Sequence, residues 1–153
     1  MSNFAERGGW WVVGQVVWFF AIGFAAFRSP RLSNETMVIA GSAMTVYGVW
    51  LSFAGARALG ERLTPYPEPL DEVTLMTRGV YRHARHPIYG GVIVSFLGVS
   101  LLTGDSLAIG LSLGLVPFFW LKSSSEERRL ADRYSDYDRY RDLVPKRLIP
   151  WIL

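Results

Sequence analysis

The sequence contains no cysteine and two histidines. Without a thiol, disulfide bonds and thiolate chemistry are excluded. The histidines are His83 and His86, and because neither has further clear ligands beside it, we expect no metal site. The sequence also lacks a Ser/His/Asp arrangement, a phosphate-binding glycine loop and a GxGxxG nucleotide fingerprint, so these common enzyme classes are not indicated.

Long stretches of the chain are nearly free of charge. Half of the 153 residues are hydrophobic and the mean hydropathy is +0.21, which is unusual for a water-soluble domain. The charged residues gather in residues 61–85 and 122–147. This alternation is typical of a chain that crosses a membrane several times. The net charge of +3 could serve a nucleic acid, but arginine-rich flanks of membrane helices explain it without a further assumption, so we expect no nucleic-acid partner.

Apolar segments predict an all-α, polytopic membrane protein that forms a single domain over residues 1–153. The predicted spans are approximately residues 10–27, 36–58, 87–103 and 106–121. The last two are short for a bilayer core, and Thr103–Ser106 lies between them as a tight turn, so we expect a helical hairpin whose polar ends extend it. In this turn Gly104 can end one helix, and Asp105 or Ser106 can cap the next.

Small residues within the spans indicate where helices pack closely. Gly41, Gly48 and Gly55 recur every seven residues, which places them on one stripe of the second span and predicts a packing seam. The GxxxG pattern at residues 110–114 predicts a second close contact, on the fourth span. Pro117 predicts a kink near the exit of that span.

Arginine sets the orientation of the predicted spans. The turn at Thr103–Ser106 contains no lysine or arginine, whereas the segments 59–86 and 122–153 on either side of the hairpin are rich in arginine. By the positive-inside rule both flanking segments face the cytoplasm, and four spans then return the N-terminus to the same side. Arg28 and Arg31 fall in the first outside loop and run against this rule. We expect the cell (inner) membrane, with a site that faces the cytoplasm.

The charged segment after the last span has a helical pattern of its own. Leu130, Tyr134 and Tyr137 are spaced i, i+4, i+7, which predicts an amphipathic helix over residues 122–141 lying along the membrane interface. Together with the loop 59–86, this C-terminal segment is expected to form the functional site.

The densest group of polar side chains lies in the stretch RGVYRHARHPIYGG. Pro87 falls in the first turn of the third predicted helix, which places His86 near the N-cap and Arg85 just before it. The N-terminus of a helix offers free N–H groups and a partial positive charge, which suit a carboxylate or another anion. Gly90 and Gly91 lie about one turn further in, where they leave space for a ligand or for a second helix.

An acidic pair, Glu126 and Glu127, follows the fourth predicted span. The hairpin returns this pair to the level at which the third helix begins, so the two glutamates are expected to lie close to Arg85 and His86. Opposite charges at a membrane surface form either a structural ion-pair network or part of a ligand site, and the pattern alone leaves both open. Because neither histidine lies within a span, a haem or quinone redox protein is less well supported.

The stretch GVYRHARHPIYGG resembles the signature of the isoprenylcysteine carboxyl methyltransferase and phospholipid methyltransferase superfamily. The later stretch SEERRL, followed by YSDYDRYRDLVPKRLIPW, resembles the acidic pair and the C-terminal segment of the same superfamily. The similarity covers roughly residues 59–151, and the two motifs flank the predicted hairpin. It implies an integral membrane methyltransferase that uses S-adenosyl-L-methionine as its cofactor.

The resemblance also implies roles for individual residues. Arg85, His86 and Glu127 would be the catalytic residues. A larger set would bind the cofactor: Val73, Thr74, Leu75, Met76, Tyr81, His86, Pro87, Ile88, Tyr89, Gly90, Glu126 and Glu127.

The chemistry of these side chains agrees with such a cofactor. Arg85 or His86 suits its carboxylate, and one of the two glutamates suits the ribose hydroxyls or the ammonium group. Tyr81 or Tyr89 can pack on the adenine ring or face the sulfonium. Methyl transfer then requires mainly that the enzyme align and desolvate the two reactants.

The acceptor of the methyl group is left open by these residues. A carboxylate or a thiolate needs no base, whereas an amine must lose a proton, which His86 or a glutamate could accept. We therefore keep a prenylated carboxylate, a phospholipid amine, and a small apolar thiol or hydroxyl, each entering laterally from the bilayer. A non-catalytic membrane scaffold that keeps the same fold is the alternative to an enzyme.

Overall fold

The computed structural model describes residues 8–28, 33–60, 63 and 75–153. Within these ranges the chain is all-helical, as the apolar segments predict. The elements are α1 (Gly9–Arg28), α2 (Glu35–Leu59), a 3₁₀ helix η2 (Gly79–Arg82), α3 (Pro87–Thr103), α4 (Ser106–Arg133) and α5 (Tyr137–Leu143).

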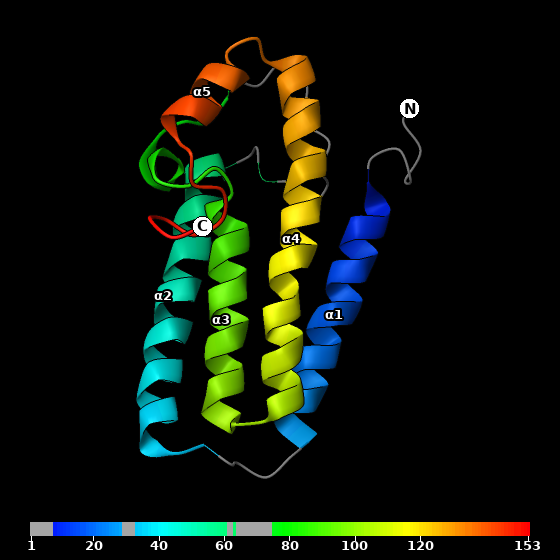
Figure 1. Ribbon diagram of the computed structural model, residues 1–153, viewed down its shortest axis with the longest axis vertical. Helices are drawn as coiled ribbons and strands as arrows, with labels where there is room; N and C mark the ends of the chain where they lie inside the picture. Colours follow the sequence, from blue (N-terminus) through cyan, green and yellow to red (C-terminus); the bar gives the residue numbers. More distant parts are fainter. Residues whose placement is uncertain (1–7, 29–32, 61–62, 64–74) are drawn as a thin grey trace.

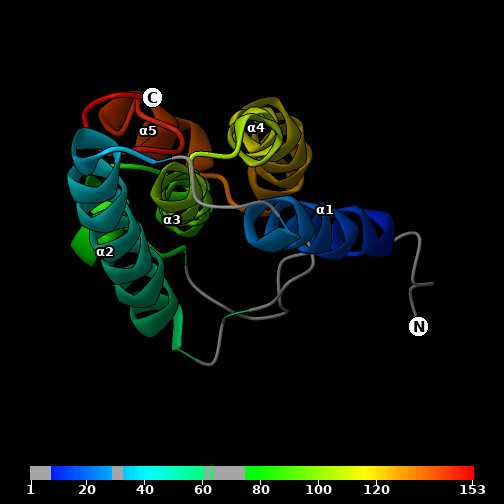
Figure 2. The ribbon, with the colours of Figure 1, turned by 90° about the horizontal axis from the view of Figure 1, so that it is seen from below.

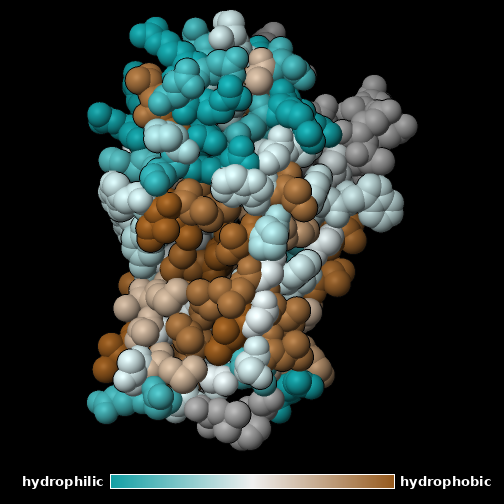
Figure 3. All heavy atoms as spheres, viewed as in Figure 1, coloured by the Kyte–Doolittle hydropathy of each residue, from teal (hydrophilic) through white to brown (hydrophobic). Residues whose placement is uncertain are grey.

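The four long helices stand side by side, and α5 lies across one end of them (Figure 1). Viewed along the bundle, α3 lies between α2 and α4, and α1 packs on the outer side of α4 (Figure 2). The end that carries α5 is also where α3 begins and where α4 ends. We call it the polar end, because hydrophilic residues gather there above a hydrophobic band (Figure 3).

Three of these helices, α1, α2 and α4, are long and apolar enough to cross a membrane, and α3 is a shorter apolar helix of 17 residues. The predicted spans are therefore confirmed as helices within one or two residues at most of their ends, apart from the end of α4. Large apolar side chains on α1, such as Phe20, Phe24 and Phe27, are more than 70% exposed, as lipid contact requires.

Glycines hold α2 and α3 together almost backbone to backbone. A Cβ atom added at Gly48 would lie 2.5 Å from the carbonyl oxygen of Gly91, and one added at Gly41 would lie 2.7 Å from that of Gly98. One added at Gly55 would lie 2.6 Å from the side chain of Ile88. The predicted packing seam is confirmed, and the space left at Gly91 is taken by a second helix.

The turn between α3 and α4 also matches its prediction. Gly104 ends α3 in the left-handed conformation with φ 70°, and Asp105 caps α4 by accepting a hydrogen bond of 2.8 Å from the backbone N–H of Ala108. The GxxxG pattern on α4 is only half used. A Cβ atom at Gly114 would lie 2.7 Å from the ring of Trp18 on α1, whereas nothing lies within 4 Å of one at Gly110.

The prediction of a separate helix over residues 122–141 is wrong. Helix α4 continues from the apolar span without interruption to Arg133, through Pro117, and only the turn at residues 134–136 separates it from α5. The physical reason is that residues 122–133 contain no glycine or proline, and they are mostly good helix formers. The predicted apolar positions do meet: Leu130 and Tyr134 pack against Tyr137 in one cluster.

The seam predicts opposite effects for two glycine-to-alanine changes. Gly48→Ala forces the backbones of α2 and α3 apart, and overpacking of this kind costs about 1–3 kcal/mol. Gly110→Ala meets open space and replaces a poor helix former, so it leaves stability unchanged or raises it by up to about 1 kcal/mol. Thermal unfolding of both variants in the same detergent measures the difference, and equal melting temperatures would contradict the seam.

Candidate active site

The start of α3 is held by the last part of the chain. Pro87 occupies the first turn of α3 and His86 is its N-cap residue, as predicted. The backbone N–H groups of Arg85 and His86 donate to the carbonyl oxygens of Lys146 and Arg147, over 3.0 Å and 2.7 Å. The C-terminal segment therefore lies directly on the polar stretch before α3.

Gly90 makes this close approach possible. A side chain at this position would collide with the carbonyl group of Leu148, which lies against the first turn of α3. The space that the sequence predicts beside Gly90 is thus filled by the C-terminal segment of the same chain. Leu148 is fully buried here, in a cluster with Ile93 and Phe119 of the hairpin.

Glu127 is the centre of the polar end. Its side chain is 7% exposed, and it accepts hydrogen bonds from Arg85 Nε (2.8 Å), His86 Nε2 (3.1 Å) and Arg147 Nη2 (2.9 Å). We call these four residues the Glu127 cluster. The structural ion-pair network, one of the two alternatives from the sequence, is therefore present. It joins the start of α3, the end of α4 and the C-terminal segment.

Glu126 differs from its neighbour in both exposure and partners. Its side chain is 25% exposed, accepts a hydrogen bond of 2.9 Å from the Tyr89 hydroxyl, and has Nδ1 of His86 at 3.6 Å. Among the charged residues described, none makes an ion pair as short with Glu126 as Arg85 does with Glu127. The carboxylate of Glu126 can therefore accept a further hydrogen bond from a ligand, whereas that of Glu127 is occupied by contacts within the protein.

A stack of rings leads from the Glu127 cluster toward the interior of the bundle. The His86 ring stacks on that of Tyr89 at 5.5 Å, and Tyr89 stacks on Phe119 at 4.8 Å. Lys122 Nζ lies 5.1 Å from the centre of the Tyr89 ring and donates to Gln15 Oε1 of α1 over 2.6 Å. Lys122 is only 1% exposed, so a positive charge is buried beside the site.

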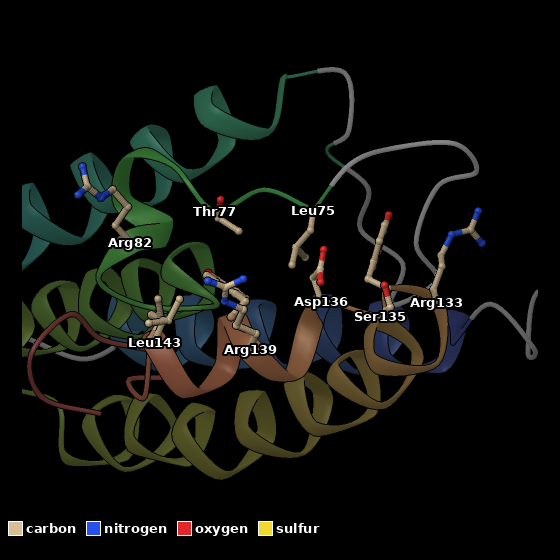
Figure 4. A pocket seen from close by; sticks show the side chains of 11 residues that line it. Leu75, Thr77, Arg82, Arg133, Ser135, Asp136, Arg139 and Leu143 are labelled. Atoms are coloured by element: carbon tan, nitrogen blue, oxygen red, sulfur yellow. The ribbon is translucent and has the colours of Figure 1, made fainter.

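A pocket of about 830 Å³ lies at the polar end, between α5 and the segment that carries Leu75 and Thr77 (Figure 4). Its charged lining residues are Arg82, Arg133, Asp136 and Arg139, and its remaining lining residues are Leu75, Thr77, Tyr134, Ser135, Tyr140, Leu143 and Val144. The pocket is therefore both basic and partly apolar.

The pocket and the Glu127 cluster share a wall. The Tyr140 hydroxyl donates to the carbonyl oxygen of Tyr81 over 2.7 Å, and Arg85 Nη1 donates to that of Val144 over 2.6 Å. Burial raises the pKa of both Tyr81 and Tyr140, so their hydroxyls stay protonated near neutral pH and remain hydrogen-bond donors.

The structure brings together the three predicted catalytic residues, with Pro87, Tyr89 and Glu126 next to them. Ile88 instead faces α2, and of the predicted cofactor residues that the structure describes, only Leu75 lines the pocket. Met76 is half-buried near Leu75 in the chain, and Val73 and Thr74 lie outside the described residues. The cofactor and catalytic roles of all these residues stay predictions.

Sequence reasoning missed Arg147 and Gln15. Arg147 belongs to the VPKRLIPW segment that carries the resemblance, but nothing in its spacing shows that it returns to the start of α3. Its guanidinium lies 4.3 Å from the centre of the Trp120 ring, so α4 holds it from two sides. The sequence does mark Gln15, because it is the one strongly polar residue of the span 10–27, and polar residues within spans usually have a function.

Comparison with known proteins agrees with this site. The family model of phospholipid methyltransferases (PEMT) matches residues 36–137, which include the Arg85–His86 pair, the hairpin and both glutamates. The chain belongs to the phospholipid methyltransferase family. A curated relative, the protein-S-isoprenylcysteine O-methyltransferase of Schizosaccharomyces pombe, is 38% identical over 73 residues, which are 46% of this chain and 31% of the relative. The match thus spans about a third of that relative's length.

Three expectations from the sequence are confirmed by these findings. The resemblance to the superfamily is correct, and methyltransferases of this family use S-adenosylmethionine. The apolar helices and the family together show that the chain is an integral membrane protein.

The Glu127 cluster predicts a stability effect that an exposed ion pair does not share. Glu127→Gln removes the charge that Arg85 and Arg147 face, and breaking a buried ion pair on one side costs about 3–5 kcal/mol. Asp138→Asn is the matched control, because the Asp138–Arg141 pair is exposed and contributes at most about 1 kcal/mol. Thermal unfolding in detergent measures both, and a Glu127→Gln variant as stable as Asp138→Asn would show that the cluster is not structural.

Proposed function

We propose that this chain is an S-adenosylmethionine-dependent methyltransferase that methylates a lipidic or small apolar acceptor at the membrane surface. The observation that supports the proposal is the difference between two adjacent glutamates. Glu127 is buried and fully hydrogen-bonded within the protein, whereas Glu126 is partly exposed. Glu127 fixes Arg85, His86 and the C-terminal segment in place, while Glu126 presents a partly exposed carboxylate beside Tyr89. This arrangement lies at the end of the hairpin that the family motifs flank.

The described residues fit the chemistry of the cofactor. A volume of about 830 Å³ lies within the range of small-molecule sites, about 300–1,000 Å³. Because Arg85 is engaged with Glu127, two of the arginines that line the pocket, Arg82 and Arg139, are better placed than Arg85 to meet a carboxylate. Glu126, Tyr81 and Tyr89 do not line this pocket. A cofactor that extends from the pocket toward the Glu127 cluster would meet Glu126 with its ammonium group or ribose hydroxyls, and the two tyrosines with its adenine or sulfonium.

Once bound, the cofactor supplies a methyl group that is activated by the positive charge of its sulfonium. The protein's own contribution is to position and to desolvate. The Glu127 cluster keeps three segments in register, which fixes the position of His86 and of the neighbouring Glu126. Tyr89 holds the Glu126 carboxylate through its hydroxyl and stacks between His86 and Phe119, which restricts its rotation.

Lys122 supports a choice between the acceptor classes. Ionisable residues buried inside membrane bundles usually mark a functional site. A buried lysine near Tyr89 and Glu126 attracts a carboxylate and repels the ammonium head of a phospholipid amine. A carboxylate also needs no base, so the engagement of His86 with Glu127 is no obstacle. We therefore propose a carboxylate on a lipidic acceptor that enters from the bilayer.

The positive-inside rule supports the orientation of this site. The polar end carries the arginine-rich segments 75–86 and 122–153, whereas the turn at Thr103–Ser106 at the opposite end carries none. The polar end is therefore proposed to face the cytoplasm, from which a water-soluble cofactor arrives. We propose that both segments and the helices form a single domain over residues 1–153. The proposed location is the cell membrane.

Cofactor binding separates the enzyme from a non-catalytic scaffold with the same fold. Isothermal titration of the detergent-purified protein with S-adenosylhomocysteine is expected to show saturable binding. Glu126→Gln should weaken binding at least about tenfold, since hydrogen bonds to charged groups contribute about 1.5–3 kcal/mol. Because Glu126 is partly exposed, the same variant should unfold within a few degrees of the wild type, in contrast to Glu127→Gln. Absence of binding by the wild type would favour the scaffold.

Lys122 predicts a preference for charge in the acceptor. With labelled S-adenosylmethionine, an S-prenylated cysteine carboxylate should be methylated in preference to phosphatidylethanolamine. Lys122→Met should raise the KM for the carboxylate at least about tenfold, because a charge-assisted contact is lost, while Lys122→Arg retains most of the affinity. Gln15→Leu is the matched control, since it removes the partner on α1 and keeps the charge. Label that appears in phosphatidylethanolamine alone would contradict the proposed acceptor.

A further inference from the structure

The segment formed by residues 146–153 presents two different faces. On one face, Arg147 donates to Glu127 and the carbonyl group of Leu148 lies against the first turn of α3, so this face closes the Glu127 cluster. On the other face, Trp151 is 71% exposed and Ile152 is 74% exposed. A segment that helps to build the buried site therefore also presents two large apolar side chains to its surroundings.

A defined turn holds these two side chains outward. The backbone N–H groups of Leu148 and Ile149 both donate to the carbonyl oxygen of Leu153, over 2.8 Å and 2.9 Å. The chain is thus closed into a small loop whose tip carries Trp151 and Ile152. Their exposure follows from the hydrogen bonds of the backbone.

Trp151 adopts a backbone conformation that tryptophan does not favour. Its φ is 64°, and it alone has a positive φ among the non-glycine residues described. In this region the Cβ atom crowds the backbone, so a tryptophan costs free energy that a glycine would avoid. The ring of His83 lies 5.2 Å from that of Trp151, but it leaves most of the residue exposed. Strain retained at an exposed aromatic residue points to a partner outside the chain.

The turn lies at the height where apolar residues give way to charged ones. On α4 this change follows Trp120 and Leu121, which are both exposed. The guanidinium of Arg147 lies 4.3 Å from the centre of the Trp120 ring, so the segment reaches α4 at this height. Figure 1 marks the C-terminus beside the upper part of α3, and at the same height in Figure 3 the hydrophobic band meets the polar end.

The lipid bilayer is the partner that this surface fits. Lipid covers the hydrophobic band, because the chain is an integral membrane protein, and the turn continues the band at its border. Tryptophan is enriched at membrane–water interfaces, where its apolar ring meets lipid while its N–H group stays near water. The exposed Ile152 beside it adds apolar area that lipid can bury.

We propose that residues 149–152 form a membrane-interface anchor, in which Trp151 and Ile152 enter the boundary between the lipid headgroups and the acyl chains. The anchor holds the segment that carries Arg147 and Leu148, and with it the Glu127 cluster, at the level of the headgroups. The inference goes beyond the proposed function and does not depend on the reaction that the site performs.

The depth of Ile152 in a bilayer tests the anchor. Because the chain has no cysteine, Ile152→Cys allows a single spin label to be placed at this position. In nanodiscs of phosphatidylcholine and phosphatidylglycerol the label should lie about 5–10 Å into the headgroup and acyl boundary, where dissolved oxygen reaches it and a water-soluble nickel chelate does not. Asp138→Cys is the matched control, since the Asp138 side chain is 69% exposed on α5 and its label should show the opposite accessibility.

Two results would overturn the anchor. One is a label at position 152 that the nickel chelate reaches as readily as the label at position 138. The other is a label that is shielded from both reagents and broadened by dipolar coupling to a second label, because a second copy of the chain would then cover the turn.

Hydrogen exchange in the same nanodiscs tests whether the anchor holds the site. Trp151→Gly removes the indole and relieves the backbone strain, so a turn held by protein contacts alone should become tighter. If lipid holds the turn, the backbone N–H groups of Arg85 and His86, which donate to residues 146–147, should instead exchange severalfold faster. His83→Ala is the matched control, since it removes the ring contact and keeps the indole. Slower or unchanged exchange in Trp151→Gly, or an equal acceleration in His83→Ala, would overturn the holding role.

Discussion

The polar end of this protein depends on one buried carboxylate. Glu127, near the end of α4, accepts hydrogen bonds from Arg85 and His86 at the start of α3 and from Arg147 of the C-terminal segment. Each of these groups would be costly to bury alone, and together they satisfy one another. The carboxylate of Glu127 therefore holds the start of α3 and the C-terminal segment against the end of α4.

Two identical residues that are adjacent in the chain have different environments because they lie on a helix. Successive residues of α4 point about 100° apart, so Glu127 turns toward Arg85 while Glu126 turns toward Tyr89 and the surface. The sequence shows an acidic pair and cannot show this division. The structure shows which glutamate has which environment, because burial and hydrogen-bond partners differ between the two carboxylates.

The sequence predicts those features that depend on local rules. Glycine and aspartate end and begin helices at Gly104 and Asp105, the seven-residue spacing of glycines gives the α2–α3 seam, and a hairpin must return Glu127 to the level of His86. It does not predict features that depend on tertiary contact. The pairing of Arg147 with Glu127 joins residues 20 positions apart through a reversal of the chain that no spacing reveals. The continuation of α4 to Arg133 is likewise not apparent from the sequence, because the change from apolar to charged residues near position 122 resembles a helix boundary, although polarity does not break a helix.

The glycine seam between α2 and α3 has a mechanical consequence. Where backbones touch directly, as at Gly48 and Gly91, no side-chain rotamers can adjust, so the interface slides or bends very little. Helices α2 and α3 should therefore move as one rigid unit. If helices separate to let a hydrocarbon chain pass, they must do so at an interface filled by long side chains, such as the contact of Trp18 with Phe118 between α1 and α4.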